Sequence, residues 1–164
     1  MKLNTDFRSQ EDNFLRELLL NGKKILIITG EKNSGKSTII EKIIGCLSTA
    51  GKTVNGIITK SCFSDNIKLG YNSINISNGN VYQLASTSES QKHKLKQGQY
   101  FFDENAFDEI NKALKEDMTA DVIVFDEVGY LELREKGFYV SLKHCIANFP
   151  GKLLLIIRSN LLEE

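Results

Sequence analysis

The feature that most restricts the fold of this chain is a short glycine-rich segment, Gly30 to Ser37, which reads GEKNSGKS. It matches the pattern G-x-x-x-x-G-K-[ST], and it lies between an apolar run at 25–28 and a helical pattern that starts near Lys36. Such a loop can wrap its backbone N–H groups around an anion, because its glycines adopt angles that a side chain would block. The segment therefore predicts a phosphate-binding turn between a buried strand and a helix.

The rest of the pattern predicts buried strands that alternate with helices. Uninterrupted apolar runs at 25–28 and 122–125 are typical of strands covered on both faces. Two more strand-like runs, 52–63 and 67–76, flank turn residues at Ser64–Asn66 and predict a hairpin after the first helix. We expect an α/β fold with a parallel sheet wrapped by helices. The other expected elements are helices at 36–50, 103–117 and 135–148, a strand at 152–159 and a loop at 77–98.

The first 22 residues form a separate region in this interpretation. Apolar residues between 14 and 19 recur at helical spacing, and Asn21-Gly22 ends the pattern. We therefore divide the chain into a helical N-terminal extension, residues 1–22, and one P-loop domain, residues 23–164.

The charge balance and the composition limit the classes of partner that the chain is expected to bind. The 21 basic residues balance the 21 acidic ones, so no basic excess points to nucleic acid. No apolar run approaches the roughly 20 residues that a helix needs to cross a bilayer. Three widely spaced cysteines, Cys46, Cys62 and Cys145, predict reduced thiols. We expect a cytoplasmic protein without membrane association, and a protein partner stays open.

The glycine loop also predicts individual contacts to a nucleotide. Lys36 supplies a point charge to the β- and γ-phosphates, and the Ser37 hydroxyl is a ligand for Mg²⁺. Backbone N–H groups from Lys32 to Thr38 point inward, and the helix adds the positive end of its dipole. The expected nucleotide-binding residues are Gly30, Glu31, Lys32, Asn33, Ser34, Gly35, Lys36, Ser37 and Thr38.

Two adjacent acids, Asp126 and Glu127, follow the apolar run at 122–125. Neighbouring carboxylates repel each other and are costly to desolvate, so their presence at the end of a buried strand needs a counter-charge. We assign Asp126 to the Mg²⁺, opposite Ser37, and Glu127 to the orientation and deprotonation of an attacking water. This pair favours hydrolysis over transfer, although transferases also carry adjacent acids.

A cation is also expected to neutralise the charge that develops in the transition state. The chain has only four arginines, and two of them are candidates. Arg158 ends the strand at 152–159, and Arg134 lies in the loop after the acids. Surface charge is an equally good interpretation for each. If neither arginine is in place, turnover should be slow, because a missing arginine finger costs on the order of 10³–10⁵ in rate.

These motifs resemble the THEP-type family of P-loop nucleoside triphosphatases. The resemblance covers most of the chain from about Lys24 and rests on the glycine loop, on GIITKS…KLGYNSINI, on QYFFDENAFDEI and, most specifically, on DEVGYLELREKGF. It implies a P-loop NTPase fold with a mostly parallel, RecA-like sheet flanked by helices. It also implies Mg²⁺-dependent hydrolysis of ATP, GTP and other nucleoside triphosphates, and it supports Lys36, Ser37, Asp126 and Glu127 in the roles given above.

The surroundings of the expected site depart from the family pattern. Tyr130 stands where the family usually has a lysine, and Phe63 replaces an arginine. Lys60 and Ser61 replace acids that usually follow the hairpin threonine. The leading hypothesis is therefore a slow nucleoside triphosphatase. Two alternatives stay open: a small-molecule or nucleoside kinase, and an adaptor that uses the nucleotide as a switch.

Overall fold

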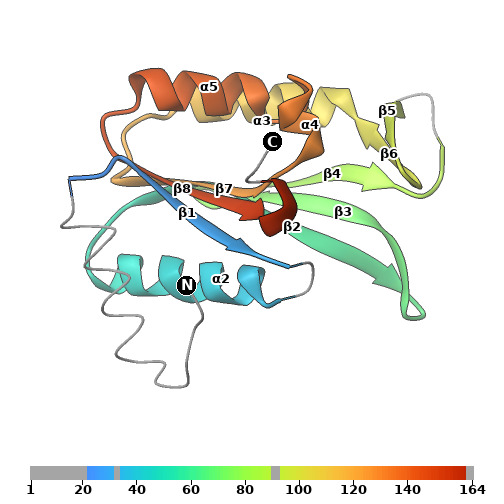
Figure 1. The fold of residues 1–164 in the computed structure, drawn as a ribbon, viewed down its shortest axis with the longest axis horizontal. Coiled ribbons are helices and arrows are strands. Elements are labelled where there is room, and N and C mark those ends of the chain that lie inside the picture. Colours follow the sequence, from blue (N-terminus) through green and yellow to red (C-terminus); the bar gives the residue numbers. More distant parts are fainter. Residues whose placement is uncertain (1–21, 32–33, 90–92, 162–164) are drawn as a thin grey trace.

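The protein is described by a computed structural model that covers residues 22–31, 34–89 and 93–161 (Figure 1). The helix predicted before Asn21 lies outside these residues. The described elements, in chain order, are β1 (Ile25–Gly30), α2 (Lys36–Thr49), β2 (Val54–Ser64), β3 (Ile67–Asn75), β4 (Val81–Ser86), β5 (His93–Gln97), β6 (Tyr100–Asp103), α3 (Glu104–Glu116), β7 (Val122–Val128), α4 (Tyr130–Leu133), α5 (Tyr139–Asn148), β8 (Lys152–Arg158) and the 3₁₀ turn η1 (Ser159–Leu161).

The eight described strands form one sheet in the order β1-β8-β7-β2-β3-β4-β6-β5. The pairs β1–β8, β8–β7 and β7–β2 are parallel, and the remaining four pairs are antiparallel. The α/β P-loop architecture is confirmed, but the sheet is mixed and not mostly parallel. Figure 1 shows α2 on one face of the sheet and α3, α4 and α5 on the other.

The strands β7 and β8 are buried on both faces, as their apolar runs predict, but the same prediction is wrong for β1, which ends the described sheet and has Ile27 49% exposed. In β7, Val122 and Val124 pack into the cluster under α2, whereas Ile123 and Phe125 pack into the cluster under α3 and α5. The same alternation occurs in β8. The apolar residues at the centre of these strands therefore alternate between the two cores, which fixes the position of the strand ends where the acids lie.

The predicted hairpin is confirmed, and its turn has the expected chemistry. Asp65 and Asn66 connect β2 to β3 with φ angles of 48° and 64°. Positive φ at both central residues matches the twist of the two strands, and Asn and Asp tolerate it better than most residues. The helix predicted at 103–117 is confirmed as α3, where the Asp103 carboxylate accepts a hydrogen bond from the N–H of Asn105.

The loop predicted at 77–98 is wrong, because this segment contributes β4 and β5 to the sheet. Its many polar residues suggested a loop, yet Leu84 and Ala85 are buried in the core under α3. Antiparallel strands with one solvated face tolerate polar residues at alternate positions, so polarity alone misled the prediction. The extra strands also explain why the sheet is mixed.

The helix predicted at 135–148 begins later, at Tyr139, and is preceded by the short α4. The turn between them uses left-handed angles at Glu135 and Gly137, which end the first helix. The buried Glu132 carboxylate holds the turn together, since it accepts the N–H groups of Gly129 at 2.7 Å and Phe138 at 2.9 Å. Burial raises the pKa of Glu132.

Among the described residues, no helix has both the length and the apolar character required to cross a membrane.

Candidate functional site

The carboxyl ends of the parallel strands β1, β8 and β7 lie beside the start of α2. Gly30, the last residue of β1, pairs with Arg158 of β8, and Asp126 of β7 pairs with Ile156 of β8. A cavity of about 260 Å³ opens here, which we call the loop cavity. Its lining combines the glycine loop, both acids and residues of the hairpin: Ser34, Gly35, Lys36, Ser37, Thr38, Thr59, Ser61, Lys68, Tyr71, Asp126, Glu127 and Arg158.

Within the described part of the glycine loop, Gly35 has the backbone angle that its sequence predicts. Gly35 precedes α2 with a φ angle of 86°, a left-handed conformation that favours glycine. The Lys36 ammonium crosses the loop and donates to the carbonyl oxygens of Gly30 at 2.9 Å and Glu31 at 2.7 Å. Lys32 and Asn33, at the loop tip, lie outside the described residues. The loop thus presents a half-buried cation beside the first N–H groups of a helix.

Asp126 is buried, with 3% of its surface exposed, and one of its carboxylate oxygens, Oδ2, has no hydrogen-bond partner among the residues that the structure describes. Its backbone carbonyl accepts a hydrogen bond from the Thr59 hydroxyl. Burial raises the pKa of the carboxyl group from 3.8 to about 7, and the neighbouring Glu127 adds to the effect. A buried, unpaired carboxylate oxygen that shares a cavity with the Ser37 hydroxyl is a donor set that fits Mg²⁺.

Glu127 lies within β7, since the strand continues to Val128 and does not end at the acids as expected. The register with β8 shifts between Asp126 and Val128, so Glu127 is the extra residue of a bulge. A strand normally sends adjacent side chains to opposite faces, and a bulge breaks this alternation. The shift explains how two consecutive acids can both line the loop cavity.

The Glu127 carboxylate is paired with Arg158. The guanidinium donates from Nε to Oε1 and from Nη2 to Oε2, the latter over 3.4 Å. Both side chains are partly buried, and this hydrogen bond raises the pKa of Arg158. Arg158 thus lies at the cavity as its sequence position suggests, but it contacts the second acid directly. Arg134, the other expected cation, is exposed at the end of α4 and does not line the loop cavity.

Lys68 is a cation of this site that sequence analysis missed. It projects from β3 into the loop cavity, with its ammonium 3.8 Å from the centre of the Tyr71 ring. Burial lowers the pKa of Lys68, and the nearby Arg158 acts in the same direction. The prediction considered arginines only. The predicted hairpin could have indicated Lys68, because the hairpin places β3 two strands from β7, where a long side chain can reach the acids.

A second cavity of about 280 Å³ adjoins the first and is lined mainly by rings, so we call it the aromatic cavity. It lies toward β6 and α4, and it shares four lining residues with the loop cavity, namely Thr59, Tyr71, Glu127 and Arg158. Sequence analysis did not predict it, because its walls come from the segment taken as a loop, from α3 and from the residues after the acids. The rings that line it are Tyr71, Tyr100, Phe102, Phe107, Tyr130 and Phe138.

The fold and the loop together define the class of this protein: it is an α/β protein of the P-loop type. The family model described as NTPase matches residues 25–163, and the chain therefore belongs to this NTPase family. The THEP-type resemblance is confirmed. The curated protein named nucleoside-triphosphatase THEP1 of Archaeoglobus fulgidus is 32% identical over 68% of this chain and 64% of its own length. A cancer-related nucleoside-triphosphatase homolog of Bos taurus is 25% identical over 79% of this chain and 72% of its own length.

Two solved structures are similar. The human cancer-related nucleoside triphosphatase superposes with a TM-score of 0.69 at 23% identity, over 83% of this chain and 76% of that one. THEP1 from Aquifex aeolicus superposes with a TM-score of 0.62 at 26% identity, over 82% and 77%. The chain spans about 64% of the length of the Archaeoglobus fulgidus relative, just under two thirds.

Proposed function

We propose that this chain is a Mg²⁺-dependent nucleoside triphosphatase that hydrolyses ATP, GTP and related triphosphates to the diphosphate and phosphate. The buried, unpaired Oδ2 of Asp126 carries the proposal. It lies in one cavity with Lys36 and Ser37, and a buried carboxylate without a partner is costly unless a cation joins it. The relatives' names, which describe nucleoside triphosphatases, support the same activity.

In this proposal Ser37 and Asp126 would hold Mg²⁺, and the glycine loop would bind the phosphates. The ion, when bound, neutralises charge on the β- and γ-phosphate oxygens. Lys36 gives up its carbonyl partners, Gly30 and Glu31, to contact the same oxygens. The N–H groups at the start of α2 add a positive partial charge. Residues 30–38 are the proposed nucleotide-binding segment.

Glu127 is the proposed base that orients and deprotonates water. Its pairing with Arg158 sets a condition on this role, because a carboxylate held by a guanidinium accepts a proton poorly. Transfer of Arg158 from Glu127 to the γ-phosphate would release the base and neutralise the transition state in one step. Until that exchange occurs, both groups are engaged with each other. This supports slow turnover as the basal behaviour.

Lys68 is a second proposed transition-state cation. Its ammonium lines the loop cavity and rests on the Tyr71 ring, which holds it there without neutralising it. Arg134, exposed on α4, is a weaker candidate than either Arg158 or Lys68. The three cysteines are free, which supports the proposed cytoplasmic location.

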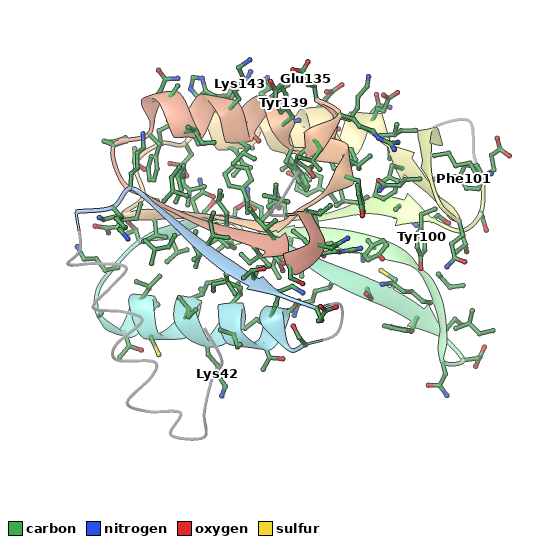
Figure 2. The ribbon with its side chains drawn as sticks, in the orientation of Figure 1. Lys42, Tyr100, Phe101, Glu135, Tyr139 and Lys143 are labelled. Carbon is green, nitrogen blue, oxygen red and sulfur yellow. The ribbon has the colours of Figure 1, made fainter. Side chains whose placement is uncertain are left out.

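The test is phosphate release from ATP and GTP by the purified full chain, with Mg²⁺ or with excess chelator. We expect release only with Mg²⁺, and loss of release in Lys36→Ala. The matched control is Lys42→Ala, since Lys42 lies on α2 and points away from the sheet (Figure 2). Equal release in chelator, or full activity in Lys36→Ala, would overturn the proposal.

A further inference from the structure

The aromatic cavity borders the proposed hydrolytic site and has the features of a binding site for a ring. One part of its wall is open, since Tyr71, Tyr100 and Tyr130 are only partly buried, whereas Phe107 and Phe138 belong to the buried core. Tyr71 and Tyr100 meet edge to face with centroids 5.0 Å apart, and Phe107 and Phe138 do the same at 4.8 Å. Partly exposed rings around a hollow supply the flat, apolar surfaces on which aromatic ligands stack.

Apart from the tyrosine hydroxyls, the polar side chains of this cavity come from five residues: Thr59, Gln97, Glu127, Glu132 and Arg158. Gln97, in the β5–β6 hairpin, offers a carboxamide that can both donate and accept hydrogen bonds. Glu127 and Arg158 form the boundary with the loop cavity. An apolar pocket with a small number of orienting polar groups is the usual form of a small-molecule site. The volume of about 280 Å³ is just below the usual range of such sites, which is roughly 300–1,000 Å³.

The two cavities approach Glu127 from different sides. The glycine loop and the start of α2 line the loop cavity, whereas β6, α3 and α4 contribute to the aromatic cavity. Figure 1 shows α2 on the opposite face of the sheet from α3 and α4. A triphosphate held by the loop would have its terminal phosphate near Glu127, and a ligand of the aromatic cavity would lie beside that phosphate, since Glu127 and Arg158 line both cavities.

We propose that the aromatic cavity is a second-substrate site, which binds a nucleoside and presents its sugar hydroxyl to the γ-phosphate. This inference rests on the proposed nucleotide site. The base would stack on Tyr100 and meet the Tyr71 ring edge to face, with Gln97 on its edge, and the sugar would face Glu127. A bound nucleoside would also exclude water from the carboxylate, so that the hydroxyl replaces water as the nucleophile.

The reaction is a phosphoryl transfer. The hydroxyl oxygen forms a bond to the γ-phosphorus as the bond from that phosphorus to the β,γ-bridging oxygen breaks. The electron pair of the broken bond stays on the nucleoside diphosphate. The hydroxyl proton moves to the Glu127 carboxylate. The products are a nucleoside diphosphate and a nucleoside monophosphate, and no oxidant, reductant or third reactant is needed.

The experiment measures how the γ-phosphoryl group divides between water and a nucleoside. The full chain is incubated with Mg²⁺ and γ-labelled ATP, with adenosine, guanosine, cytidine, uridine or thymidine in turn, and the labelled products are separated. We expect labelled monophosphate from at least one nucleoside. In Tyr100→Leu the transferred fraction should fall about ten-fold, because stacking of a base on an aromatic side chain contributes about 1–3 kcal/mol.

The matched control is Tyr139→Leu. Figure 2 shows Tyr139 with Glu135 and Lys143 on the outer surface of α5, away from the aromatic cavity, so the transferred fraction should not change. Gln97→Leu serves as a second test that leaves the rings intact, and it should also lower the fraction. Melting temperatures show whether each variant folds.

The outcomes separate this inference from the proposed function. Label in free phosphate, but in none of the five nucleosides, overturns the second-substrate site and leaves the hydrolase proposal standing. Monophosphate that forms equally well in Tyr100→Leu and Gln97→Leu also overturns it, because the ligand then binds elsewhere. No release of label at all means that the proposed function fails and the inference fails with it.

Discussion

Replacement of Asp126 by asparagine should make the metal-free protein more stable at pH 8, although it removes a residue of the proposed metal site. The reason is the burial of this carboxyl group. Its pKa rises from an ordinary value of 3.8 to about 7, with burial as the main cause and the charge of Glu127 as a further one. Above pH 7 the folded protein must therefore hold a buried charge, whereas the amide of an asparagine carries none.

The magnitude follows from the two pKa values. A difference of about three pH units corresponds to about 4 kcal/mol at about 1.36 kcal/mol per unit. Between pH 4 and pH 7 the folded state holds a proton on Asp126 that the unfolded state has lost, so the free energy of unfolding falls as pH rises through this window. This contribution of Asp126 to the free energy of unfolding is fully present below about pH 4, and it is lost once pH exceeds the folded pKa of about 7.

The assay is urea denaturation of the parent and Asp126→Asn at several pH values, in chelator and in Mg²⁺. In chelator, the free energy of unfolding of the variant should equal that of the parent near pH 4 and exceed it by up to about 4 kcal/mol at pH 8. Mg²⁺ should stabilise the parent at pH 8 but not the variant, and its effect should weaken below pH 7 because binding must displace a proton. An asparagine variant that is less stable than the parent at pH 8 without metal would refute this reasoning.

Two further predictions concern the hairpin. Lys68→Ala should lower kcat at least ten-fold with a smaller change in KM, because cations that contact the transferring phosphoryl group contribute mainly in the transition state. Lys60→Ala is its control, since Lys60 pairs with Glu41 on the exposed surface, and a parental rate in both variants would remove Lys68 from the mechanism. Gly56→Ala should destabilise the protein by more than about 3 kcal/mol in urea, because Gly56 has a φ of 119° and an added Cβ would overlap the carbonyl oxygen of Val124. A change below about 1 kcal/mol would show that this close approach is not rigid.

The sequence predicted the part of the site that is local along the chain. The glycine loop, the start of α2 and the acids of β7 are each carried by a short segment, and their physical chemistry is independent of distant residues. The strands that hold them were also predictable, because uninterrupted apolar runs are rare outside buried strands. The hairpin was located correctly from its turn chemistry, with Asp65 and Asn66 at the turn.

The rest of the site depends on contacts between segments that are far apart in the chain. The pairing of Glu127 with Arg158 arises because β7 and β8 are neighbours and a bulge turns Glu127 toward the cavity. A bulge of one residue leaves no compositional trace. Lys68 reaches the acids only because β3 is placed next to β2, and its sequence position is that of an ordinary strand residue. The aromatic cavity needed residues of β4 and β5, Leu84 and Gln97, in the segment whose polar composition suggested a loop.

The division of labour between the two acids is the central claim, and single-turnover hydrolysis of Mg-ATP, measured together with nucleotide affinity, tests it most directly. Glu127→Gln keeps the size and most hydrogen bonds of the side chain but cannot accept a proton. It should bind Mg-ATP as the parent does and hydrolyse it at least ten-fold more slowly, because a positioned general base contributes typically ~10²–10⁴-fold to the rate. Asp126→Asn should lose affinity and rate together, because it disturbs the proposed metal site. Hydrolysis at the parental rate in Glu127→Gln would contradict the account.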